Sequence, residues 1–121
     1  MDSILQTIKK LLGVPLEQTH FDTDIIIHIN STFSVLKDLG VGPMEGFRIL
    51  DDLAVWEEFI SEYDPNFSSI QDYIYYRVKL RFDPPASSTH LQALKDAIAE
   101  AEWRLNNRAE HEQTTEEEQW N

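Results

Sequence analysis

The sequence predicts an all-α fold, a small bundle of four to five helices with one irregular loop or hairpin excursion and a flexible C-terminal arm. Apolar residues recur at spacings of three and four in several separate segments, the pattern of helices that bury one face. Glycine, proline and aspartate stand between these segments and break them. The 121 residues are expected to form one helical domain, residues 1–110, followed by an acidic tail, residues 111–121.

The first helix is predicted over residues 2–12. Asp2 or Ser3 can cap its start, because either side chain offers an oxygen to the free N–H groups of the first turn. Gly13 ends it, since glycine adopts the left-handed conformation found after many helices. Its buried face is expected to consist of Ile4, Ile8, Leu11 and Leu12.

The second helix is predicted to run to about residue 39. Asp22 or Thr23 can cap its start, and Gly40 is a suitable C-terminal stop. Four apolar residues at spacings of three, four and three form its inner face: Ile26, Ile29, Phe33 and Leu36.

An irregular excursion follows over residues 41–52, where two glycines and a proline interrupt any regular pattern. Residues 47–50 are strand-like in composition, which leaves room for a small hairpin. A short helix is predicted around residues 53–62, and Asp64-Pro65-Asn66 breaks it.

The last two helices are predicted over about residues 68–82 and 88–110. Asp83-Pro84-Pro85 separates them, because each proline lacks an N–H and clashes with the preceding turn. The inner seam of the final helix repeats at three, four, three and four: Leu91, Leu94, Ile98, Ala101 and Leu105. Trp103 points away from this seam, so another helix of the subunit covers it, or it lies flat on the surface, or it belongs to a subunit interface.

The charge of the chain disfavours nucleic acid as its main ligand. The formal net charge is −12, with five acids and no Lys or Arg in residues 110–121. Phosphate binding needs a basic footprint, so DNA is expected only as a molecule that passes without adhering. Purely apolar runs such as residues 25–27 and 53–56 are far too short to span a bilayer, so no membrane partner is expected.

No motif in the sequence carries enzyme chemistry. The four histidines do not stand in a metal-ligand pattern, and no cysteine is present. The paired carboxylates are expected to be exposed to solvent, and the serine pairs before helices are expected to cap them. We therefore expect no catalytic residue, no metal and no cofactor. Trp120, near the end of the acidic tail, is either idle or an anchor that orders on a basic partner.

Five stretches, in this order and in a chain of this length, resemble the head–tail adaptor proteins of long-tailed bacteriophages, which are also called head-completion or connector proteins. The resemblance covers the chain to about residue 109. It includes the first two helices and the exit from the second, and also the Asp-Pro-Pro corner and the last helix. The matching stretches are residues 4–13, 21–30, 39–43, 75–85 and 102–106.

The resemblance implies a structural virion protein of the neck, between capsid and tail, assembled in the host cytoplasm. Such proteins form a ring under the portal protein, expected to follow its twelvefold symmetry. They extend the DNA channel and dock a stopper or tail-completion protein. Residues 88–121 would then form an arm that embraces the portal, and the excursion would be a loop available to neighbours or to the channel.

Two groups of residues are expected to make these contacts. The portal or subunit interface would involve Trp103, Leu105, Arg108, Glu116, Glu117, Glu118 and Trp120, and the loop contacts would involve Met44, Phe47, Arg48 and Ile49. The alternatives from the residues alone are an acidic DNA-mimic inhibitor encoded by a phage and a small helical regulatory protein.

Overall fold

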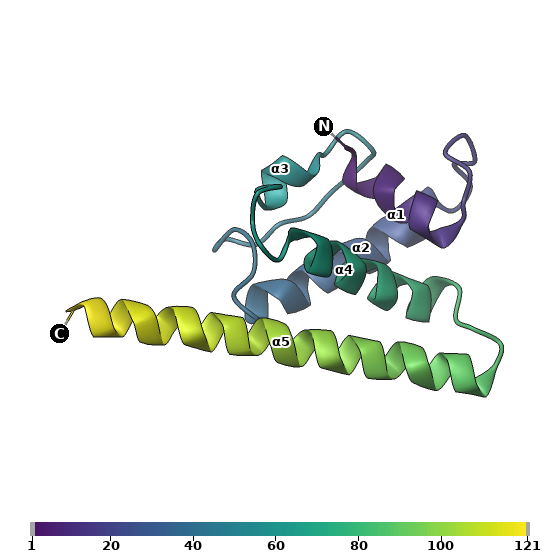
Figure 1. The fold of residues 1–121 in the computed structure, drawn as a ribbon. Helices are drawn as coiled ribbons and strands as arrows, with labels where there is room; N and C mark the ends of the chain where they lie inside the picture. Colours follow the sequence, from purple (N-terminus) through teal and green to yellow (C-terminus); the bar gives the residue numbers. More distant parts are fainter. Residues whose placement is uncertain (1, 121) are drawn as a thin grey trace.

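The structure is a computed structural model that describes the backbone of residues 2–120 and the side chains of residues 2–108. Over this range the fold is all-α, as predicted, with no strand and one isolated bridge between Ser3 and Val55 (Figure 1). The helices are α1 Ile4–Leu12, α2 Asp22–Asp38, α3 Trp56–Phe59, α4 Phe67–Phe82 and α5 Ser88–Trp120.

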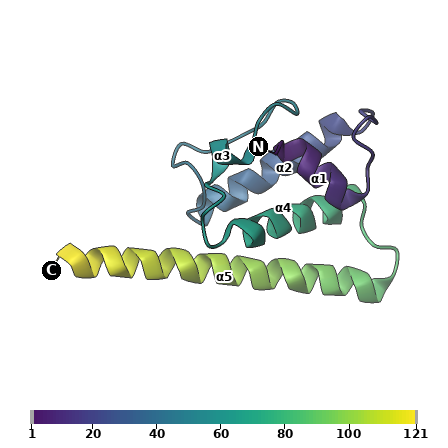
Figure 2. The same cartoon turned by 45° about the horizontal axis from the view of Figure 1, so that its top comes forward.

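Helix α4 is the centre of the arrangement. It packs against α1 and α2 on one side and against α5 on the other (Figures 1 and 2). Both views show α5 running beside α4 and continuing past the rest of the molecule. The fully buried side chains include Ile4 and Ile8 from α1, Ile29 from α2, and Tyr73 and Ile74 from α4.

The predicted end of the first helix at Leu12 is confirmed, whereas its start at Ile4 lies two residues later than predicted. Of the two candidate caps, Ser3 is used, and its hydroxyl accepts a hydrogen bond from the Gln6 N–H at 3.3 Å. Gly13 ends the helix with φ 79°, a conformation that costs other residues steric strain. Leu11, predicted to be buried, is 44% exposed, because the core reaches α1 mainly through its first two turns.

The start of α2 differs from the prediction. Phe21 is the N-cap and makes no side-chain cap, so neither Asp22 nor Thr23 has that role. The Asp22 carboxylate instead forms an ion pair with Lys9 at 2.8 Å. The inner face is also rotated slightly, since Ile25 is fully buried whereas Ile26 is only half-buried.

The excursion contains no strand or hairpin, which corrects the prediction for residues 47–50. The backbone of Ile49 pairs with a side chain of α2 instead of a second strand. The Asn30 side chain donates to the Ile49 carbonyl at 2.9 Å and accepts from the Ile49 N–H at 2.8 Å. Phe47 packs against Phe33 and Phe59, with ring centroids 5.2 and 5.5 Å away. The excursion is therefore held on the body at both residues.

Replacing Asn30 by Ala is expected to destabilise the protein by about 2 kcal/mol. The change leaves the N–H and carbonyl of the buried Ile49 backbone unpaired, and an unpaired buried polar group costs about 1–3 kcal/mol. Denaturant unfolding measures the loss. The neighbouring Ser34→Ala, which removes only an exposed hydrogen bond to the Asn30 carbonyl, is the matched control and should change stability by less than about 0.5 kcal/mol. Equal losses of stability in the two variants would contradict the role of Asn30 in holding the Ile49 backbone.

Helix α3 is shorter than predicted. Residues 54–56 pair with the extended N-terminus, where the Ile4 N–H donates to the Ala54 carbonyl at 3.0 Å and the Trp56 N–H donates to the Asp2 carbonyl at 3.3 Å. Ile60 is again extended, with φ −146° and ψ 156°. Tertiary pairing on one side and an extended exit on the other limit this helix to one turn.

The corner between the last two helices is confirmed. α4 ends at Phe82, with Asp83 as its C-cap, and α5 begins at Ser88 after the two prolines. Ser87 caps α5, because its hydroxyl accepts from the His90 N–H at 3.4 Å. α5 then stays helical to Trp120 and does not end near residue 110 as predicted, so it crosses the expected boundary between domain and tail.

Candidate interaction surfaces

The inner face of α5 joins the helix to the body. The predicted seam is confirmed: Ile98 and Leu105 are buried, and Leu94 and Ala101 pack partly buried against the same core. Leu105, expected at a portal or subunit interface, is 3% exposed and thus already buried within the subunit. The seam therefore belongs to the fold, and any interface on α5 must use its other faces.

Two polar contacts hold α5 in place, one to α4 and one to the segment just before α4. The Tyr73 hydroxyl donates to the Glu102 carboxylate at 2.8 Å, and Arg77 pairs with the same oxygen at 3.1 Å. Further along, Arg108 pairs with Asp64 at 3.1 Å. Arg108, another expected interface residue, is therefore engaged inside the subunit. The two contacts also show that α5 runs antiparallel to α4.

Burial raises the pKa of the Tyr73 phenol well above its usual value of 10.0, and the hydrogen bond to Glu102 raises it further. A phenol whose pKa is raised by folding stabilises the protein fully below the unfolded pKa and loses that contribution as the pH rises above it. We therefore expect stability to fall above about pH 10. Tyr73→Phe should flatten this slope and cost about 1–2 kcal/mol at neutral pH.

Urea unfolding between pH 8 and pH 11 measures this effect. Tyr63→Phe is the matched control, because Tyr63 is 86% exposed and its replacement should leave the alkaline slope unchanged. If Tyr73→Phe and Tyr63→Phe gave the same slope, the account of the Tyr73–Glu102 contact would be wrong.

The outer face of α5 has an exposed tryptophan. Trp103 is 66% exposed, so no other helix of the described subunit covers it. A position flat on the surface and a subunit interface both remain as predictions. Beside it, Arg104 pairs with Glu100 at 2.7 Å, one turn earlier on the same helix. The side chains of Trp120, Glu116, Glu117 and Glu118, also expected to make contacts, lie outside the described residues.

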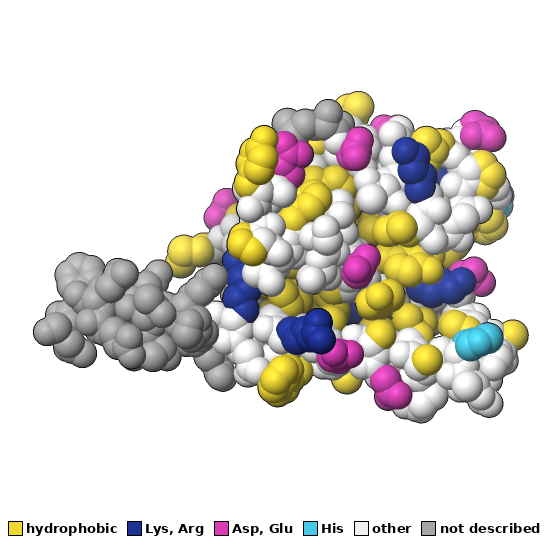
Figure 3. Space-filling model, in the orientation of Figure 1, with side chains coloured by type: hydrophobic (Ala, Val, Ile, Leu, Met, Phe, Trp, Pro, Cys, Tyr) yellow, Lys and Arg dark blue, Asp and Glu magenta, His cyan; other side chains and the backbone are white. Residues whose placement is uncertain are grey.

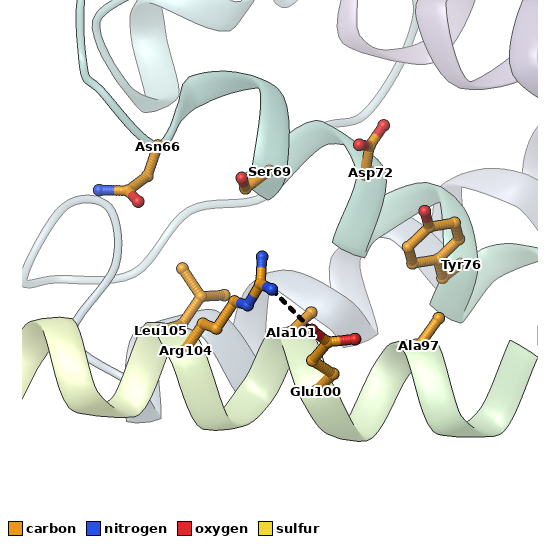
Figure 4. A pocket seen from close by; sticks show the side chains of 9 residues that line it. All are labelled: Asn66, Ser69, Asp72, Tyr76, Ala97, Glu100, Ala101, Arg104 and Leu105. Atoms are coloured by element: carbon orange, nitrogen blue, oxygen red, sulfur yellow. Dashed lines mark hydrogen bonds and ion pairs between the residues drawn. The ribbon is translucent and has the colours of Figure 1, made fainter.

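A groove of about 260 Å³ lies between α4 and α5 next to this face (Figure 4). Ser69, Asp72 and Tyr76 line it from α4, and Arg104 reaches into it from α5. Figure 3 shows apolar side chains along the line between α5 and the rest of the body on this side, with acidic and basic side chains around them.

The four expected loop residues have different positions in the structure. Met44 is 93% exposed, and Arg48 is also exposed. Phe47 is half-buried in the aromatic cluster, and Ile49 is 1% exposed. Met44 and Arg48 are thus accessible to a neighbour, whereas Phe47 and Ile49 hold the loop in place.

The described residues contain neither a metal centre nor a membrane segment. No group of three or more His, Asp or Glu side chains among them could hold a metal ion. No described helix is long and apolar enough to cross a membrane. The described residues form a compact helical body from which α5 projects, with Trp103 exposed on its outer face.

Comparison with known proteins identifies the family of this chain. A family model described as phage connector protein matches residues 4–112, from the start of α1 into the second half of α5. The chain therefore belongs to the phage connector protein family, a structural family of virion components. Searches of curated proteins and of solved structures each found no match.

Proposed function

We propose that the protein is a head–tail adaptor that forms a ring under the portal, extends the DNA channel and docks the stopper or tail-completion protein. Membership of the phage connector family supports a role in the neck of the virion. The ring is expected to follow the symmetry of the portal, and assembly is expected in the host cytoplasm.

The long outer face of α5 carries this proposal. The helix is 33 residues long, and only its inner face packs against α4. Its outer face presents Trp103, a residue type enriched where protein surfaces meet. The exposed indole is thus available for contact with another protein, and in an adaptor this contact would be with the portal.

The charge of the protein suits passage of DNA through the ring. The formal net charge is −12, so a surface that faces the channel repels the phosphate backbone instead of retaining it. The exposed loop residues Met44 and Arg48 are our candidates for contact with a neighbouring subunit or with the channel.

Trp103→Ala is expected to weaken loading onto the portal by at least about 30-fold, which corresponds to the loss of about 2 kcal/mol for a hot-spot tryptophan. The side chain lies mostly in solvent, so the variant should keep its helical content and unfolding midpoint. Co-sedimentation with portal rings measures the loading.

The matched control for this experiment is Tyr63→Ala, which removes another exposed aromatic side chain, from the segment between α3 and α4. It should load normally. If a folded Trp103→Ala variant loaded onto the portal normally, the proposed contact between the outer face of α5 and the portal would be wrong.

A further inference from the structure

We propose that a basic pocket between α2 and α4 binds the acidic C-terminal segment, residues 110–121, of a neighbouring copy of this chain. The inference rests on the proposed ring, because it names a contact between adjacent subunits. The outer face of α5 around Trp103 remains free for the portal.

The pocket is small and basic. It has a volume of about 150 Å³ and is lined by His28, Ser31 and Thr32 from the middle of α2 and by Arg77, Leu80 and Arg81 from the last turns of α4. No Asp or Glu lines it. In a chain with a net charge of −12, this is a local reversal of the general charge.

The two arginines have donors to spare. Arg81 is exposed, and its guanidinium has no ion pair or hydrogen bond among residues 2–108. Arg77 uses only Nη1 for Glu102 and Tyr73. The nearby carboxylate of Asp83 is occupied by Lys79 at 2.9 Å. A guanidinium is suited to grip a carboxylate with two parallel N–H groups, so the pocket fits a Glu side chain from outside the subunit.

The acidic segment is the complementary surface within the same chain. Residues 110–121 contain five acids and no Lys or Arg: Glu110, Glu112, Glu116, Glu117 and Glu118. Opposite charges on two surfaces of one chain favour contact between copies when geometry prevents contact within one copy.

The direction of α5 prevents the contact within one copy. Because Arg77 meets Glu102 and Asp64 meets Arg108, α5 passes the start of α4 near Arg108. It then continues to Trp120, about 18 Å further at 1.5 Å per residue. Arg81 lies at the other end of α4. The acidic end therefore leaves the body at one end while the pocket lies towards the other, the arrangement of a head-to-tail contact between copies.

At physiological salt, such a contact between subunits should be stable only in the assembled ring. Exposed ion pairs are individually weak and are screened by salt. On a portal, the adjacent subunit is held within reach, and the high effective concentration makes weak contacts count. Free subunits would then stay monomeric.

Disulfide cross-linking tests the contact, since the chain has no cysteine of its own. One batch of protein carries Ser31→Cys in the pocket, and a second batch carries Glu117→Cys in the acidic segment. The batches are mixed, loaded onto portal rings and oxidised. We expect a band that joins the two batches. Glu17→Cys, on an exposed loop, replaces Ser31→Cys in the control and should give no such band. Portal loading without any band between Ser31→Cys and Glu117→Cys would overturn the inference and leave the proposed function intact.

A second measurement does not depend on the portal. A labelled peptide of residues 110–121 is titrated onto the full-length protein at low salt, and Arg81→Glu should weaken its binding at least tenfold. Lys10→Glu, an exposed charge reversal on α1, is the control and should have little effect. A duplex DNA oligonucleotide is titrated in parallel. The inference would be contradicted if Arg81→Glu left the affinity for the peptide unchanged. It would also be contradicted if Arg81→Glu weakened binding of the DNA but not of the peptide.

Discussion

Lys9→Ala is expected to destabilise the protein by about 3–5 kcal/mol, the cost of removing one partner from a buried charge pair. The Lys9 side chain is 2% exposed. Its ammonium lies 2.8 Å from the Asp22 carboxylate and donates to the carbonyls of Leu16 and Gln18 at 3.1 and 2.7 Å. The change leaves these three acceptors without their donor and frees the connector between α1 and α2.

Urea unfolding measures the loss, and Lys10→Ala is the matched control because Lys10 is exposed on the same helix. The control should cost less than about 0.5 kcal/mol. Lys9→Met combined with Asp22→Leu should recover much of the stability, since an apolar pair of similar volume avoids the unpaired charge. Equal stabilities of Lys9→Ala and Lys10→Ala would show that the buried ammonium does not hold the connector.

Gly42→Ala is expected to cost about 3 kcal/mol. A Cβ at this position would collide with the Phe59 ring, which is packed in the core between Phe33 and Phe47. The backbone at Gly42 also has φ 89°, a conformation that costs other residues about 1–2 kcal/mol. Overpacking a core side chain adds about 1–3 kcal/mol.

Gly13→Ala separates these two contributions. Gly13 has a similar φ of 79°, but nothing lies within 4 Å of the position that a Cβ would occupy. Its replacement should therefore cost only the backbone strain, about 1 kcal/mol. Thermal or denaturant unfolding of both variants gives the comparison, and a Gly42→Ala variant no less stable than Gly13→Ala would contradict the close packing of Phe59.

The parts of the fold that depend on local chemistry could be predicted from the sequence. Asp83-Pro84-Pro85 ends a helix wherever it occurs, because the missing N–H groups and the ring clash are properties of proline itself. Ser3 and Gly13 delimit α1 for similarly local reasons. The seam of α5 follows from helical periodicity, and Ile98 and Leu105 are buried as this periodicity requires.

The parts that depend on distant residues could not be predicted. From the sequence alone, Lys9 is expected to be an exposed charge. It is buried because the connector after α1 brings Asp22 within 2.8 Å of its ammonium. From the sequence alone, Asn30 is only a polar residue of α2. In the structure its side chain pairs with the N–H and carbonyl of Ile49, groups that a neighbouring strand would pair with in a hairpin. The length of α3 is set by pairing with the N-terminus, which no local pattern encodes.

The candidate surfaces were predicted in part. The exposed position of Trp103 followed from its angle to the seam, and the structure agrees. Leu105 and Arg108 lie in the same stretch, but one is buried and the other is engaged with Asp64. The basic pocket could not be predicted from the sequence. Arg77 and Arg81 belong to one helix and His28 and Ser31 to another, and only the packing of the two helices brings them together.

Native mass spectrometry of the protein, first alone and then with the portal ring of the same phage, tests the adaptor role most directly. We expect a monomer of 14.1 kDa alone and a stoichiometric complex with the portal. A protein that stays monomeric in the presence of intact portal rings would contradict the adaptor role.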